Sequence, residues 1–171
     1  DIPYIVHPLG VGLILALSGA SEEIVIAGIL HDTLEDSIAE KKITKEMLEA
    51  EFNEEIANLV VSVTEQNKEL PWEVRKQEAL EHIKEFSQGS LLVKSADILN
   101  NASELLEDYN EIVNEIFFRF NASREKILQH YRQSIIAILE QCKESPLASD
   151  LSKLNVELYR IQALERGNLS Y

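Results

Sequence analysis

The sequence has few of the residues that cross-link small folds or interrupt secondary structure. Its 171 residues include one cysteine, four prolines and six glycines. A single cysteine cannot form an internal disulfide and is typical of a reducing compartment, so we expect a cytoplasmic protein. So few glycines and prolines exclude collagen-like and low-complexity character. A chain of this length buries enough surface to fold as one domain without a staple.

Positive charge and long apolar runs are also scarce. Lys and Arg number 16 against 30 Asp and Glu, which gives a formal net charge of −14. Such an acidic surface repels phosphate backbones and anionic lipids, so we expect no nucleic-acid and no membrane partner. The apolar run at residues 24–30 has seven residues, far fewer than the ~20 that span a bilayer. An anionic substrate therefore needs a local cation, either a metal ion or a small Lys/Arg cluster.

The remaining signals indicate helices almost throughout. Residues of the N-cap type precede most apolar segments, namely Ser21, Thr44, Asn53, Ser90 and Ser123. These signals predict helices at about residues 22–36 (buried on all sides), 44–52, 53–63, 71–86, 91–107, 110–120 and 124–145. No Asn-Gly or Asp-Gly hairpin and no alternating strand is present. The sequence therefore predicts an all-α fold, a single compact multi-helix bundle.

Pro146 separates a last predicted helix from the rest of the chain. We expect a main domain at residues 1–145 and a C-terminal helix at 146–171. That helix carries a 3–4 spaced stripe of Leu147, Leu151, Leu154, Leu158, Ile161 and Leu164. The stripe packs either on the body of the chain, which is the commoner case, or on a second subunit in a homodimer. The sequence opens with Asp1 instead of Met, so we expect an incomplete N-terminus.

Three apolar segments each carry a side chain of the metal-ligand type. His31 and Asp32 end the most apolar segment, Asp97 interrupts a second, and His7 precedes a third. A buried imidazole or carboxylate must be paired or bind a metal. His7, His31, Asp32 and Asp97 would together supply two nitrogens and two oxygens. This set suits Mn²⁺ or Fe²⁺, with Co²⁺, Ni²⁺ and Mg²⁺ as alternatives, and such an ion polarises a phosphoryl oxygen.

Each of these features also has a simpler interpretation. His31 and Asp32 could form a satisfied core pair, Asp97 could pair with Lys94, and Glu35 and Asp36 could be a solvated helix end. Two other groups are expected to play no part in chemistry. Arg75 and Lys76 are interpreted as solvent-facing or as bonded along their own helix, and His82 and His130 as surface or packing residues.

The ordered pattern His7, His31-Asp32, Asp97 resembles the HD-domain metal-dependent phosphohydrolases. The segments PYIVHPLGV, AGILHDTLEDS and LVKSADILNN resemble the (p)ppGpp hydrolase domain of RelA/SpoT-type proteins and small alarmone hydrolases. The Glu-Asp pair one turn after His-Asp is the specific part. The resemblance implies that His7, His31, Asp32 and Asp97 bind Mn²⁺ and that Glu35 and Asp36 activate water. It further implies that Asn101 contacts the substrate and that Lys94 contacts it or supports the site.

The implied reaction is hydrolysis of the 3′-pyrophosphate of guanosine tetra- or pentaphosphate to GDP or GTP and pyrophosphate. Two positions depart from the family pattern: Asn100 and Ser103 stand where many members have His and Arg. We interpret both changes as affecting the nucleotide side and not the metal side. The alternatives are an HD phosphohydrolase acting on another nucleotide or phosphomonoester, a nucleotide-sensing module without turnover, and a structural adaptor.

Overall fold

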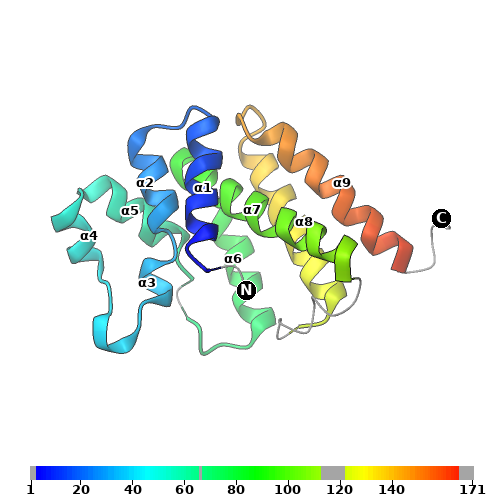
Figure 1. Ribbon diagram of the computed structural model, residues 1–171, viewed down its shortest axis with the longest axis horizontal. Helices are drawn as coiled ribbons and strands as arrows, with labels where there is room; N and C mark the ends of the chain where they lie inside the picture. The colour runs from blue at the N-terminus through cyan, green and yellow to red at the C-terminus, as the bar shows by residue number, and fades with distance from the viewer. Residues whose placement is uncertain (1–2, 66, 113–121, 166–171) are drawn as a thin grey trace.

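The computed structural model describes residues 3–65, 67–112 and 122–165, and within these ranges it consists of helices without a strand (Figure 1). The elements are α1 (Val6–Leu17), α2 (Glu22–Leu30), α3 (Thr33–Asp36), the 3-10 turn η1 (Ala39–Lys41), α4 (Lys45–Glu51), α5 (Glu54–Val63), α6 (Trp72–Ile83), α7 (Gln88–Ile112), α8 (Arg124–Gln141) and α9 (Ala148–Glu165). The predicted all-α fold is confirmed.

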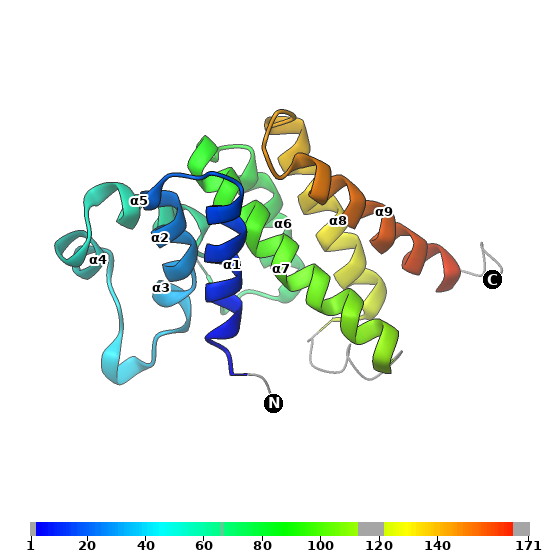
Figure 2. The ribbon, with the colours of Figure 1, turned by 45° about the horizontal axis from the view of Figure 1, so that its top comes forward.

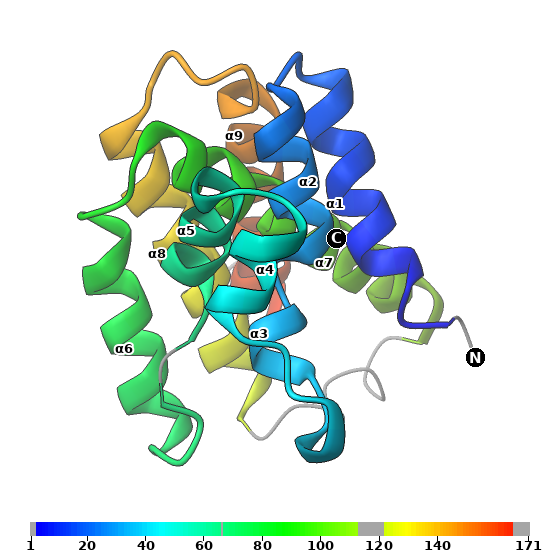
Figure 3. The same cartoon turned by 90° about the vertical axis from the view of Figure 1, so that its left-hand side faces the viewer.

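Helix α7 is the centre of the molecule. It packs against α1, α2 and α5 and also against α8 and α9, and Figure 2 shows it between α1 and α8. Helix α6 packs on α8, and Figure 3 shows α6 and α1 on opposite sides of the molecule. The buried apolar residues of α7 include Leu91, Val93, Ala96, Ile98 and Ala102. Asp97 therefore lies on a helix whose surroundings are apolar, where a carboxylate needs partners.

The helix starts follow the predicted caps with two exceptions. Ser21, Thr44 and Asn53 each accept a hydrogen bond from the amide three residues later. Ser90 is not a cap: it is buried within α7, and its amide donates to the Ser87 hydroxyl. Ser123 precedes α8, but its side chain makes no capping hydrogen bond.

The helix predicted at residues 22–36 is broken at His31 and Asp32. Helix α2 ends at Leu30 and α3 begins at Thr33. Two side chains donate hydrogen bonds to backbone carbonyls near the end of α2. His31 Nδ1 donates to Gly28 O, and the Thr33 hydroxyl donates to Leu30 O. Side chains that bond these carbonyls compete with continuation of the helix. Helix α2 is also less buried than predicted, since most of its residues outside Ala27 and Gly28 are half-buried.

Helix α7 is longer than predicted, and α1 has one buried face. Helix α7 continues without a break to Ile112, and the remainder of the helix predicted at 110–120 lies outside the described residues. Helix α1 is buried on one face, at Val11 and Leu15, while Leu13 and Leu17 are 60% and 80% exposed. Among the described helices, none has the length and apolarity of a membrane span.

Helix α9 packs against α8 and α7 of the same chain. Its leucines 151, 154 and 158 are buried, as is Leu147 just before it. Arg132 of α8 adds hydrogen bonds to Asn155 and Gln162. The described part of the stripe thus packs on the body, the first of the two expected arrangements. The division of the chain at Pro146 remains a proposal.

Candidate functional site

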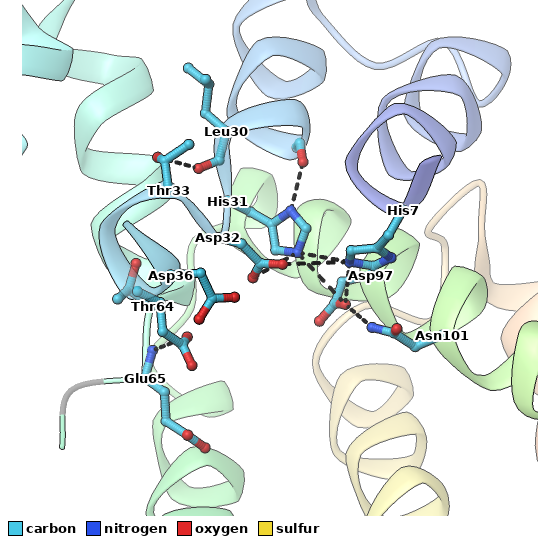
Figure 4. Close-up of polar contacts among 12 residues, drawn as sticks. His7, Leu30, His31, Asp32, Thr33, Asp36, Thr64, Glu65, Asp97 and Asn101 are labelled. Atoms are coloured by element: carbon cyan, nitrogen blue, oxygen red, sulfur yellow. Dashed lines mark hydrogen bonds and ion pairs between the residues drawn. The ribbon is translucent and has the colours of Figure 1, made fainter. Parts of the chain in front are cut away.

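Three helices that are distant in sequence bring two imidazoles and a carboxylate together. His7 lies in the first turn of α1, His31 follows the last residue of α2, and Asp97 lies within α7. One ligand atom from each lies within 4.8 Å of the others, and Figure 4 shows the three side chains converging. His7 Nε2 is 3.2 Å from His31 Nε2 and 3.6 Å from Asp97 Oδ1.

The carboxylate of Asp32 adjoins this cluster from the turn between α2 and α3. Its Oδ1 is 3.1 Å from His31 Nε2, and its Oδ2 is 3.7 Å from His7 Nε2. The structure therefore brings together all four side chains that the sequence singled out as ligands. The break in the helix at His31 and Asp32 is what places two consecutive residues beside the same point.

Each imidazole is oriented by a contact of its Nδ1 atom with an oxygen. His31 Nδ1 donates to the Gly28 carbonyl at 2.7 Å, and His7 Nδ1 lies 2.6 Å from Asn100 Oδ1. A ring whose Nδ1–H is donated to an oxygen keeps a lone pair on Nε2. Two Nε2 lone pairs and two carboxylates then face one another, and such groups repel unless a cation lies between them. The donor set therefore fits a divalent cation.

Lys94 and Asn101 hold Asp97 from two sides. Lys94 Nζ is 2.7 Å from Asp97 Oδ2, and Asn101 Nδ2 donates to Oδ1 at 2.6 Å. Burial by itself would raise the pKa of Asp97, but the neighbouring charges, of which the Lys94 ammonium is the largest, outweigh burial and lower this pKa to about 2. Asp97 is thus a carboxylate at neutral pH. Lys94 and Asn101, for which the sequence predicted a role in substrate contact or in support of the site, thus both contact this carboxylate.

Asn100 corrects one interpretation from the sequence. The change at this position was assigned to the nucleotide side, but the Asn100 side chain contacts His7. A Cβ on Gly10 would lie 2.6 Å from Asn100 Nδ2, so the glycine one turn after His7 makes room for this contact. That glycine, at helical spacing from a candidate ligand, is the signal that sequence reasoning missed.

Glu35 and Asp36 lie beside the ligand cluster, on α3. The backbone amide of Glu65 donates to Glu35 Oε2 at 3.3 Å, and Lys68 Nζ is 3.3 Å from Glu35 Oε1. Lys68 also forms an ion pair with Asp36. Partial burial alone would lower the pKa of Lys68, but the two carboxylates outweigh burial and raise it. Lys68 therefore stays charged and orients both acids.

Tyr4 links the two groups of carboxylates. Its hydroxyl donates to Asp32 Oδ2 and lies 3.5 Å from Asp36 Oδ2. Burial and the two neighbouring carboxylates raise the pKa of Tyr4, so its hydroxyl remains a donor. Tyr4, Glu65 and Lys68 were not among the residues singled out from the sequence. Glu65 and Lys68 are distant in sequence from every candidate ligand, and the contact of Tyr4 with Asp32 joins residues 28 positions apart.

Arg75 and Lys76 differ from their expected positions. Both form ion pairs with the Glu65 carboxylate, that of Lys76 at 2.7 Å. Burial would raise the pKa of Glu65, but Lys76 and Arg75 outweigh burial and lower it. The two cations therefore anchor the segment between α5 and α6 instead of facing solvent.

A cavity of about 400 Å³ joins these groups. On one side it is lined by His7, His31, Asp32, Glu35, Asp97 and Asn101, and on the other by Trp72, Arg75, Lys76, His130 and Tyr131. Its size is that of pockets for small organic ligands. His82 and His130, interpreted as surface or packing residues, both line it.

Comparison with known proteins agrees with this geometry. The HD domain family model matches residues 1–128. The guanosine-3′,5′-bis(diphosphate) 3′-pyrophosphohydrolase MESH1 of Mus musculus is 34% identical over 148 residues, covering 83% of this chain and 80% of that protein. MESH1 of Xenopus tropicalis is 41% identical over 105 residues, or 60% of this chain and 56% of that protein. The chain thus spans little more than half the length of the first curated relatives.

Two solved structures share the fold. The lmo0812 protein of Listeria monocytogenes superposes with a TM-score of 0.78 at 27% identity, covering 90% of this chain and 99% of that one. A metazoan ortholog of SpoT that hydrolyses ppGpp has a TM-score of 0.71 at 24% identity, covering 99% and 84%. The chain therefore belongs to the HD-domain family, and its relatives there include the MESH1 proteins.

Proposed function

We propose that this protein is a metal-dependent phosphohydrolase that removes the 3′-pyrophosphate of ppGpp and pppGpp, releasing pyrophosphate and GDP or GTP. One observation carries this proposal: the Nε2 atoms of His7 and His31 and the carboxylates of Asp32 and Asp97 face a common point beside Glu35 and Asp36. The names of the MESH1 relatives support the choice of substrate.

The four side chains would hold a divalent ion, Mn²⁺ first among Fe²⁺, Co²⁺, Ni²⁺ and Mg²⁺. When bound, the ion would supply Lewis acidity toward a phosphoryl oxygen and neutralise charge on the substrate. Lys94 supports Asp97, and Asn101, which lines the cavity, contacts the substrate. We also propose a cytoplasmic protein without a nucleic-acid or membrane partner, in keeping with a net charge of −14 and a single cysteine.

Glu35 and Asp36 orient and deprotonate the attacking water. Each is held in place: Glu35 by the Glu65 amide and Lys68, and Asp36 by Lys68 and Tyr4. A base must reach the proton that it removes with a fixed geometry. The hydrogen-bonded carboxylates next to the ligand cluster meet this requirement, because their rotamers are set before a substrate arrives.

The test is an assay of ppGpp hydrolysis by the purified protein with Mn²⁺, in which the release of pyrophosphate and GDP is measured. We expect turnover in the unchanged protein and a loss of about 100-fold or more in kcat in Glu35→Gln, the range for removal of a general base. The Mn²⁺ affinity should change little in this variant. Glu40→Gln, an exposed acid in η1, is the matched control and should keep full activity.

Other outcomes separate the alternatives. Turnover of another nucleotide but not of ppGpp would support an HD phosphohydrolase of different specificity. Bound metal without turnover of any nucleotide would contradict catalysis and support a sensing module.

A further inference from the structure

The cavity has a second end that the proposed reaction does not yet use. It extends from the ligand cluster to a wall made by α6 and α8, where Trp72, Arg75, Lys76, His130 and Tyr131 line it. Two acids lie near this wall, Glu65 and Glu78. Glu78 is exposed, so water screens its charge.

The charges at this end do not cancel. Arg75 and Lys76 share a single carboxylate, Glu65, whose side chain is 15% exposed. Two cations against one anion leave one positive charge in excess, in a chain whose net charge is −14. The neighbouring pair of Lys94 and Asp97 is neutral. The wall is therefore a local positive feature of the kind that an anionic ligand requires in so acidic a protein.

Two nitrogens at this end have spare hydrogen-bonding capacity. Arg75 Nε and His130 Nδ1 are buried and make no hydrogen bond within the described part of the chain. A buried polar atom without a partner is costly and calls for an explanation. Burial together with Lys76 and Lys94 lowers the pKa of His130 to about 3. At neutral pH the imidazole is therefore uncharged, so Arg75 and Lys76 supply the positive charge at this end.

We propose that the α6–α8 end of the cavity binds the distal phosphate of the substrate and, after the reaction, the pyrophosphate. This inference rests on the proposed function. In that reaction a water oxygen bonds to the phosphorus attached to the 3′-oxygen, the bond to the 3′-oxygen breaks, and that oxygen takes a proton. The reacting phosphorus must lie at the ligand cluster, so the distal phosphate and the nucleoside extend in different directions. The positively charged end suits a phosphate group. The distal phosphate is bonded directly to the phosphoryl group that reacts at the ligand cluster, whereas the ribose separates the 5′-phosphates of the nucleotide from that group, so we assign this end to the distal phosphate.

The test is calorimetric binding of inorganic pyrophosphate at a fixed free Mn²⁺ concentration, with GDP and orthophosphate titrated in parallel. Lys76→Met keeps the aliphatic stem and removes one cation. We expect pyrophosphate binding about tenfold weaker in this variant, the size of a lost charge-assisted hydrogen bond, with GDP binding unchanged. Lys84→Met is the matched control, since Lys84 is exposed at the end of α6 and pairs with Glu81.

A second variant should act in the opposite direction. Glu65→Gln removes the anion that Arg75 and Lys76 share, so pyrophosphate should bind severalfold more tightly. A purely structural role for this cluster would weaken binding in both variants. Unchanged binding in Lys76→Met, weaker binding in Glu65→Gln, or equal losses for GDP and pyrophosphate would overturn the proposal.

The readout also separates this proposal from the proposed function. Pyrophosphate binding that follows the expected pattern, without hydrolysis of ppGpp, would reject the substrate and keep the anion site. Hydrolysis of ppGpp without this pattern would reject the anion site alone.

Discussion

At the scale of single residues, the orientation of His7 depends on a neighbour that is not itself a ligand. The Asn100 oxygen lies 2.6 Å from His7 Nδ1, which directs the Nε2 lone pair toward His31 and Asp97. Partners of this kind set the tautomer and the basicity of a ligating imidazole. We therefore expect the metal affinity of this site to depend also on Asn100 of α7, which contacts a candidate ligand and is not one of the four candidate ligands itself.

Asn100→Ala should weaken Mn²⁺ binding by roughly 10- to 100-fold, the usual effect of removing such a partner. Metal titration of the purified variant measures it. Asn155→Ala, which removes a hydrogen bond to Arg132 on the other side of the molecule, should leave the affinity unchanged. Equal Mn²⁺ affinities for Asn100→Ala and the parent would show that His7 is oriented by other means.

Lys94 and Asp97 form a partly buried ion pair, with side chains 27% and 11% exposed, and its contribution to stability depends on pH. The pKa of Asp97 falls from 3.8 to about 2 in the folded chain. A lowered carboxyl pKa adds stability that is present above pH 3.8 and is lost as the pH falls toward 2. Lys94→Met should therefore destabilise the metal-free protein by about 3 kcal/mol at pH 7, because the buried Asp97 carboxylate loses its lysine partner and keeps the Asn101 amide as a hydrogen-bond donor. The difference should shrink below pH 4.

Urea unfolding of both proteins with a chelator, from pH 7 to pH 3, provides the measurement. Lys153→Met removes an exposed ion pair with Asp150 and should cost less than about 1 kcal/mol at every pH. If the Lys94→Met difference did not change between pH 7 and pH 3, the link to Asp97 would be wrong.

At the scale of elements, the close packing of α1 on α2 sets the distance between His7 and His31. A Cβ on Gly28 would lie 2.3 Å from Leu15 Cδ1 and 3.3 Å from Val11 Cγ1. The glycine thus lets α2 approach α1 at the level of two buried side chains. The Gly28 carbonyl also accepts the hydrogen bond from His31 Nδ1. Gly28 therefore affects both the packing of α2 on α1 and the orientation of the His31 ring.

Gly28→Ala should destabilise the protein by about 1 kcal/mol, since a crowding cost of about 1–3 kcal/mol exceeds the gain of about 1 kcal/mol in helix propensity. In a Leu15→Ala background the closest contact is absent and only Val11 Cγ1 at 3.3 Å remains near the added Cβ, so the same change should be close to neutral. Thermal unfolding of the four proteins completes the cycle. A cost that persisted without the Leu15 side chain would assign the effect to the backbone of α2.

At the scale of the whole molecule, α7 and α8 connect the half that carries the ligands to α9. Leu158 of α9 is fully buried, and α9 packs against both of these helices. Leu158→Ala should cost about 3 kcal/mol, within the range for buried leucines, and Val156→Ala, at a position that is 47% exposed, should cost much less. A similar small loss in both variants would indicate that α9 adds little to the body, as a separate C-terminal unit would.

Much of this architecture follows from local patterns. The caps at Ser21, Thr44 and Asn53 and the leucine spacing of α9 predict helices correctly, because capping and amphipathic periodicity act within one or two turns. The proximity of His7, His31, Asp32 and Asp97 could also be anticipated, since an isolated His or Asp in an apolar segment requires a partner. The predictions of one continuous helix at residues 22–36 and of a helix cap at Ser90 were wrong. At both places side-chain hydrogen bonds or packing outweighed these local preferences.

By itself, the sequence determined that the chain is helical and singled out His7, His31, Asp32 and Asp97 as candidate metal ligands. The tertiary structure alone decided which atoms meet: Asn100 on His7, the Glu65 amide on Glu35, and Arg75 and Lys76 on one carboxylate. The physical reason is that local propensities act over a few residues. These contacts instead join segments whose distance depends on how close two helices pack, and no spacing in the chain encodes that distance.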